Sequence, residues 1–128
     1  MLRWVAVLLW MGGIFVLSSI PSLHSPFGHF YDFMLRKLAH IGVYAGLTAL
    51  LFLALQQHTG GTRRAWVLAV LLAAAYALTD EWHQTFVSGR QGSFRDVGID
   101  MLGVVAGYAL NKAARIFNST NGSMDTGK

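Results

Sequence analysis

The stretch WVAVLLWMGGIFVLSSI, residues 4–20, contains no charged side chain. A helix that crosses the hydrocarbon core of a membrane needs about 20 predominantly apolar residues, with about 17 as the lower limit. The stretch meets this limit and therefore predicts a membrane span near the N-terminus. A cleaved signal peptide with Arg3 as its positive end is the alternative, but no A-x-A-like cleavage site follows, and further apolar segments do.

The composition of the whole chain agrees with a membrane protein. Hydrophobic residues make up 54% of the chain and charged residues 12%, whereas an average soluble domain carries about 25% charged residues. A soluble helical bundle of this size would need a more charged surface. The absence of cysteine excludes disulfides and thiolate metal sites. The net charge of +4 is spread over the segment ends, so nucleic-acid binding, which requires a concentrated basic face, is not expected.

Three more apolar segments follow the first. They predict spans over about residues 38–55, 65–82 and 96–113, and the last two reach span length only by including polar residues at their ends. We therefore expect an all-α membrane protein, a four-transmembrane-helix bundle that forms one domain over residues 1–117. Residues 118–128 are polar and are expected to be a disordered tail.

The distribution of positive charge predicts the orientation of this bundle. Cytoplasmic loops are enriched in Lys and Arg. With four spans, one side of the membrane holds six such residues and the other holds four: Arg3, Arg63, Arg64, Lys112, Arg115 and Lys128 against Arg36, Lys37, Arg90 and Arg95. The difference predicts a multi-pass protein of the cytoplasmic membrane with both termini in the cytoplasm. The 21–37 and 83–95 loops then lie together on the outer side.

The polar residues of the apolar chain gather at this predicted outer side. Residues 79–100, TDEWHQTFVSGRQGSFRDVGID, hold four of the six acidic residues. Lys37, His40 and Tyr44 are spaced to share one helical face, and Asp80 and Glu81 lie four and three residues before Gln84. On the last span, one stripe carries Asp96, Asp100, Gly103 and Gly107.

Two explanations fit this gathering. In the first, the four cations of the outer side pair with the four acids as a structural clamp, which lowers the cost of charges at a membrane edge, about 2.5–3.5 kcal/mol each at the centre of a span. In the second, the residues form a binding or catalytic pocket. The second is favoured because the set is chemically diverse, whereas a clamp needs only one or two ion pairs.

The same residues resemble the VanZ-like family of small bacterial membrane proteins. The resemblance rests on KLAHIGVYAGL and DEWHQTFVSGRQGSFRDVGIDMLGVVAG and covers about residues 10–110. The residues that match the family pattern are Lys37, His40, Tyr44, Glu81, Gln84, Phe86, Arg90, Ser93, Asp96, Asp100, Gly103 and Gly107, with the exit of the first span at Ser18-Ser19-Ile20-Pro21. The resemblance associates the family with resistance to teicoplanin-type antibiotics, which act on cell-wall precursors outside the membrane. It implies no specific reaction, and the resistance phenotype does not transfer to this chain.

The first functional hypothesis is an outward-facing pocket for an anionic amphiphile: a membrane lipid, a lipid-linked cell-wall intermediate or a lipophilic glycopeptide. Arg90 and Lys37 would hold its phosphate or carboxylate, since Arg offers two parallel donors. The expected ligand-binding residues are Lys37, Tyr44, Gln84, Arg90, Ser93, Asp96 and Asp100. An intramembrane enzyme acting on a lipid phosphate or acyl group is the alternative, with His40 or Glu81 as general acid or base. Ser88 and Ser93 lie outside any G-x-S-x-G motif, so no nucleophile is indicated.

Metal and partner binding are weaker hypotheses. His40, Glu81, His83 and Asp96 are possible ligands, but the chain has no HExxH motif, and Glu81 and His83 diverge on a helix. We therefore predict neither a metal nor a cofactor. A helper of a larger membrane or cell-envelope assembly is also possible, because the chain has two GxxxG motifs, at Gly42/Gly46 and Gly103/Gly107. Packing among the protein's own helices explains both motifs more simply.

Overall fold

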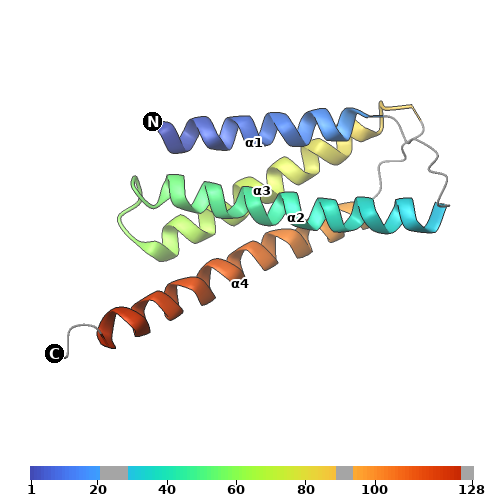
Figure 1. The fold of residues 1–128 in the computed structure, drawn as a ribbon. Coiled ribbons are helices and arrows are strands. Elements are labelled where there is room, and N and C mark those ends of the chain that lie inside the picture. The colour runs from blue at the N-terminus through green and yellow to red at the C-terminus, as the bar shows by residue number, and fades with distance from the viewer. Residues whose placement is uncertain (21–28, 89–93, 125–128) are drawn as a thin grey trace.

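The computed structural model describes residues 1–20, 29–88 and 94–124. It contains four helices in these ranges: α1 (Leu2–Ser19), α2 (His29–Leu55), α3 (Thr62–Gln84) and α4 (Phe94–Met124). In Figure 1 successive helices run in opposite directions, and the N-terminal end of α1 and the C-terminal end of α4 lie at the end of the bundle that holds the α2–α3 connection. The all-helical fold that the sequence predicts is confirmed.

The lengths and composition of the helices suit a membrane. α1, residues Met34–Leu55 of α2, and α3 are long and apolar enough to cross a bilayer. A helix satisfies its own backbone hydrogen bonds, which is required where no water is present. Among the described residues, α4 is not one of the helices that are apolar enough to cross a bilayer. This agrees with the expectation that the last span reaches span length only by including polar residues at its ends. Helix α4 is longer than the expected span at both ends and includes the first residues of the expected polar tail.

The exposed surface of α3 carries large apolar residues, whereas the surface that packs against the other helices carries small residues. Four alanines spaced four residues apart on α3 are fully buried: Ala65, Ala69, Ala73 and Ala77. Large apolar residues of the same helix, Leu71, Leu72 and Leu78, are exposed. Small residues let membrane helices pack closely, while lipid tails cover the large apolar side chains. This arrangement is that of a bundle surrounded by lipid.

Glycines set the contact between α2 and α4, which run in the same direction (Figure 1). A Cβ atom on Gly103 would lie 2.5 Å from the carbonyl oxygen of Ile41, and one on Gly107 would lie 2.5 Å from that of Ala45. No side chain fits at either distance, so the two helices can approach this closely only at glycine. The close approach predicted for this GxxxG motif is confirmed, and it fixes which residues of α2 face which residues of α4.

The other GxxxG motif also packs within the chain. A Cβ atom on Gly46 would lie 2.6 Å from Cζ2 of Trp10, whose indole N–H donates to the carbonyl oxygen of Val43 at 2.9 Å. Gly42 has open space at the corresponding position. Three of the four motif glycines are thus used by contacts between helices of one chain.

Candidate functional site

The four helices bring polar side chains together at the end of the bundle away from the termini. We call this group the polar centre. It comprises one residue of α1, two each of α2 and α3, and one of α4: Ser18, His40, Tyr44, Asp80, Gln84 and Asp100. All except His40 are at most 5% exposed. The prediction that the polar ends of the second, third and fourth spans lie together is confirmed by their hydrogen bonds.

Asp80 is held by donors from three helices. Its Oδ2 atom accepts hydrogen bonds from Ser18 Oγ at 2.9 Å, from Tyr44 Oη at 3.2 Å and from Gln84 Nε2 at 3.1 Å. The Gln84 contact follows from helical geometry, because residues four apart lie on the same face. Its Oδ1 atom is buried and has no hydrogen-bond partner among the described residues. One oxygen therefore orients the carboxylate and leaves the other available.

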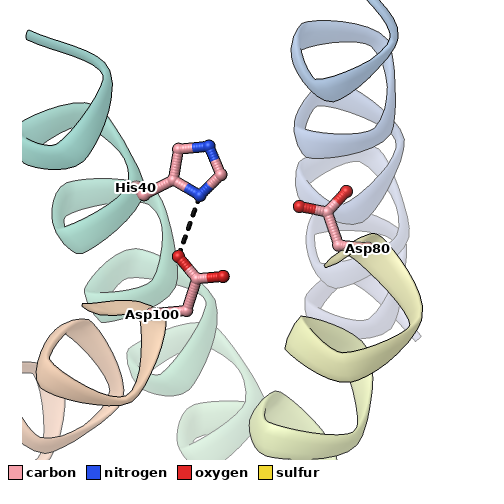
Figure 2. A group of neighbouring side chains, drawn as sticks. All are labelled: His40, Asp80 and Asp100. Carbon is pink, nitrogen blue, oxygen red and sulfur yellow. Dashed lines mark hydrogen bonds and ion pairs between the residues drawn. The ribbon is translucent and has the colours of Figure 1, made fainter. Parts of the chain in front are cut away.

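His40 and Asp100 form the second part of the polar centre. His40 Nδ1 lies 2.8 Å from Asp100 Oδ1, as Figure 2 shows. The Asp100 side chain is fully buried, whereas the imidazole is 19% exposed. Asp100 Oδ2 is buried without a hydrogen-bond partner among the described residues. This pair thus repeats the pattern of Asp80, with one oxygen engaged and one free.

The free oxygens distinguish the polar centre from a simple clamp. Leaving a buried acceptor without a hydrogen bond costs about 1–3 kcal/mol, and more when the group is charged. A clamp of ion pairs would satisfy each of its carboxylate oxygens. Two buried carboxylates that each keep one oxygen unsatisfied instead have the form of a site that receives another atom, such as a proton, a cation or a ligand donor.

Lys37 and Asp96 form an ion pair one helical turn outward from His40 and Asp100. Their side chains are 18% and 23% exposed. The two pairs join α2 to α4 like successive rungs, because Lys37 precedes His40 by three residues and Asp96 precedes Asp100 by four. The outer rung is therefore the part of the site that lies nearer the surface.

The remaining predicted site residues lie as follows. Glu81 is 5% exposed near the end of α3. Arg90 and Ser93 lie outside the described residues. His83, one of the possible metal ligands, stacks on Phe15 with ring centroids 4.4 Å apart, and its Nε2 lies 3.0 Å from Ser19 Oγ. It therefore faces α1, away from His40 and Asp100.

Asp80 and Ser18 are absent from the predicted set of site residues, although both belong to the polar centre. The spacing of Asp80 and Gln84 was a usable signal, because it places both on one helical face. The role of Ser18 depends on α1 ending beside α3, which no local pattern indicates. His40, Asp80 and Asp100 offer ligand atoms that all lie within 4.8 Å of one another, so these three could hold a cation.

A separate groove lies toward the opposite end of the bundle, between α3 and α4. Its volume is about 820 Å³, and its walls are mainly apolar. Three cations line it: Arg63, Lys112 and Arg115. Among the described residues, none of them forms an ion pair. The groove is thus the basic counterpart of the acidic polar centre.

The fold and the polar centre agree with the comparison to known families. Residues 3–117 match the VanZ/LLP1 family, which covers all four helices up to Phe117. No curated protein and no solved structure matches the chain. The match includes Lys37, His40, Asp96 and Asp100, whose pairing joins α2 to α4. The protein is therefore a membrane protein of the VanZ/LLP1 family.

Proposed function

We propose that the protein binds the headgroup of an anionic membrane lipid or lipid-linked phosphate, with the polar centre as the recognition site at the outer membrane surface. The observation that carries this proposal is the pair of buried, unsatisfied carboxylate oxygens, Asp80 Oδ1 and Asp100 Oδ2. They accept hydrogen bonds, so they suit a ligand that carries hydroxyl or ammonium donors. Lys37, one turn outward, is ion-paired with Asp96 and would bind a phosphate or carboxylate through its remaining N–H donors.

The ligand therefore needs hydroxyl or ammonium donors, a phosphate or carboxylate, and an apolar tail. Phospholipids with hydroxyl- or amine-bearing headgroups, lipid-linked sugar phosphates and lipophilic glycopeptides all combine an anion with several donors. The apolar exterior of the helices would hold the tail; Leu35, Leu38 and Leu102 are exposed there. The acidity of the polar centre argues against a ligand that is only an anion.

The fraction of purified protein that retains a bound lipid tests this proposal. Native mass spectrometry would compare the wild type with Lys37→Met, and with Lys112→Met as the matched control in the basic groove. Loss of a charge-assisted hydrogen bond costs about 1.5–3 kcal/mol, so Lys37→Met should lower lipid occupancy by about tenfold or more. The control should keep its lipid. Equal occupancy in all three proteins, or a loss in Lys112→Met alone, would contradict the proposal.

An enzyme that acts on the bound lipid is the second candidate, and the His40–Asp100 pair favours it. A carboxylate that orients an imidazole is the arrangement of a general base. His40 would then draw a proton from a water molecule or a headgroup hydroxyl. Release of phosphate or fatty acid from lipid by the wild type, lost in His40→Gln and kept in His58→Gln, would support catalysis. If the protein binds lipid but never converts it to product, lipid binding without catalysis is the function.

A further inference from the structure

Three ligand-type side chains from three helices converge inside the polar centre. His40 comes from α2, Asp80 from α3 and Asp100 from α4, and one ligand atom of each lies within 4.8 Å of the others. Figure 2 shows the two carboxylates on opposite sides of a shared space, with the imidazole beside them. A set of this kind needs helices packed in a fixed register, which Gly103 and Gly107 provide between α2 and α4.

A second observation indicates that this space takes a ligand. Asp80 is 3% exposed and Asp100 is 0% exposed, yet Asp80 Oδ1 and Asp100 Oδ2 have no hydrogen-bond partner among the described residues. In a bundle surrounded by lipid, little water is present to supply the missing hydrogen bonds. Two carboxylates this close repel each other when both are ionised. A divalent cation between them removes both the repulsion and the unsatisfied oxygens.

We propose that His40, Asp80 and Asp100 form a binding site for a divalent transition-metal ion, either Zn²⁺ or Mn²⁺. One imidazole nitrogen and two carboxylate oxygens form a mixed donor set that both ions accept. Three protein ligands also leave at least one coordination position open, as in catalytic zinc sites. This proposal goes beyond lipid binding and does not depend on it, because the three side chains come together without a lipid.

The three ligand atoms lie near enough for side-chain movements to bring them around one ion. Zinc lies about 2.0–2.2 Å from its nitrogen and oxygen ligands, so two ligand atoms at tetrahedral angles are about 3.4 Å apart. The ligand atoms here lie within 4.8 Å of one another, so ion binding requires them to move closer by as much as about 1.4 Å. His40 Nδ1 can bind the ion only through its lone pair, so any proton that it shares with Asp100 Oδ1 is released when the ion binds.

The surroundings of Asp80 are those of a supported metal ligand. Groups around a metal site hold each ligand by the atom that does not bind the ion. Ser18, Tyr44 and Gln84 donate to Asp80 Oδ2 and leave Oδ1 free in this manner. The open coordination position would then face the headgroup end of the site, where an ion could bind a phosphate oxygen. The positive charge of the ion would also offset the negative charge of the two carboxylates, so that an anion could bind in the polar centre.

The metal content of the purified protein tests the proposal without any lipid assay. The protein, stripped with a chelator and reloaded with Zn²⁺ or Mn²⁺, would be analysed by elemental mass spectrometry and by titration calorimetry. We expect a stoichiometric ion in the wild type. His40→Ala and Asp100→Asn should each lower the affinity by at least about tenfold. The matched control, His58→Ala, removes an imidazole that contacts Trp4 at the other end of the bundle and should retain the ion.

A measurement on the wild type alone guards against variants that fail to fold. A bound ion raises the thermal stability of the native protein in a saturable manner, because it binds the folded state. Saturable stabilisation by Zn²⁺ or Mn²⁺, absent with Mg²⁺ at the same concentration, supports the site. No stoichiometric ion and no stabilisation in the wild type would overturn it, as would binding that survives Asp80→Asn combined with Asp100→Asn. A loss of lipid binding with intact metal binding would instead refute only the proposed function.

Discussion

His40 Nδ1 lies 2.8 Å from Asp100 Oδ1, although the two residues are 60 positions apart in the sequence. The contact joins α2 to α4 beneath the Lys37–Asp96 ion pair. The imidazole is partly exposed and the carboxylate is fully buried, so His40 stands between the surface and the interior of the polar centre.

The His40–Asp100 contact should appear as an energetic coupling between the two residues. We predict that a double-mutant cycle of His40→Gln and Asp100→Asn gives a coupling free energy of about 1–3 kcal/mol in unfolding of the detergent-solubilised protein. A cycle of His58→Gln and Asp96→Asn is the control, because His58 contacts Trp4 at the other end of the bundle. Additivity of the first pair within about 0.5 kcal/mol would show that the contact contributes nothing.

Gly103 should be intolerant of even the smallest side chain. A methyl group there would meet the backbone of Ile41 at 2.5 Å, so Gly103→Ala should destabilise the bundle by about 1–3 kcal/mol through overpacking. Gly98→Ala on the same helix has open space around it and should be neutral or stabilising by up to about 1 kcal/mol, since alanine favours helix. Detergent unfolding of the two variants measures both effects. Equal stability of the two variants would refute the close contact.

The same glycine contact explains which parts of the site were predictable. The spacing of Lys37, His40 and Tyr44 places them on one face of α2, and the acids of α4 share a stripe with Gly103 and Gly107. These facts depend only on helical geometry. The choice of partner, His40 with Asp100 and Lys37 with Asp96, depends on how far α2 is shifted along α4. Packing at the glycines sets that shift, and the spacing of residues within each helix does not predict it.

The role of Asp80 was harder to predict for a related reason. Its carboxylate is held by Ser18 of α1 and Tyr44 of α2, as well as by Gln84 of its own helix. The sequence indicates the contact with Gln84, four residues away. The other two contacts depend on three helix ends meeting in space. The fold class, in contrast, follows mainly from the apolar composition of the chain and the lengths of its apolar segments, because apolar length decides whether a helix can cross a membrane.

The orientation of the bundle can be tested with single cysteines, since the chain has none of its own. Ser88 is exposed at the end that holds the polar centre, and Gln57 is exposed in the α2–α3 connection at the other end. We predict that a membrane-impermeant maleimide labels Ser88→Cys in intact cells and labels Gln57→Cys only after permeabilisation. The reverse pattern would place the polar centre on the cytoplasmic side and contradict its proposed access from outside.

The position of a bound headgroup is the most direct test of the central claim that the polar centre recognises a lipid. A phospholipid with a photoreactive headgroup would be incorporated with the protein into vesicles, activated by light and mapped by peptide sequencing. We predict crosslinks to residues 34–44, 80–88 and 94–101, with competition by unlabelled lipid and loss in Lys37→Met. Crosslinks confined to residues 62–71 and 105–116, which line the basic groove, would contradict the claim.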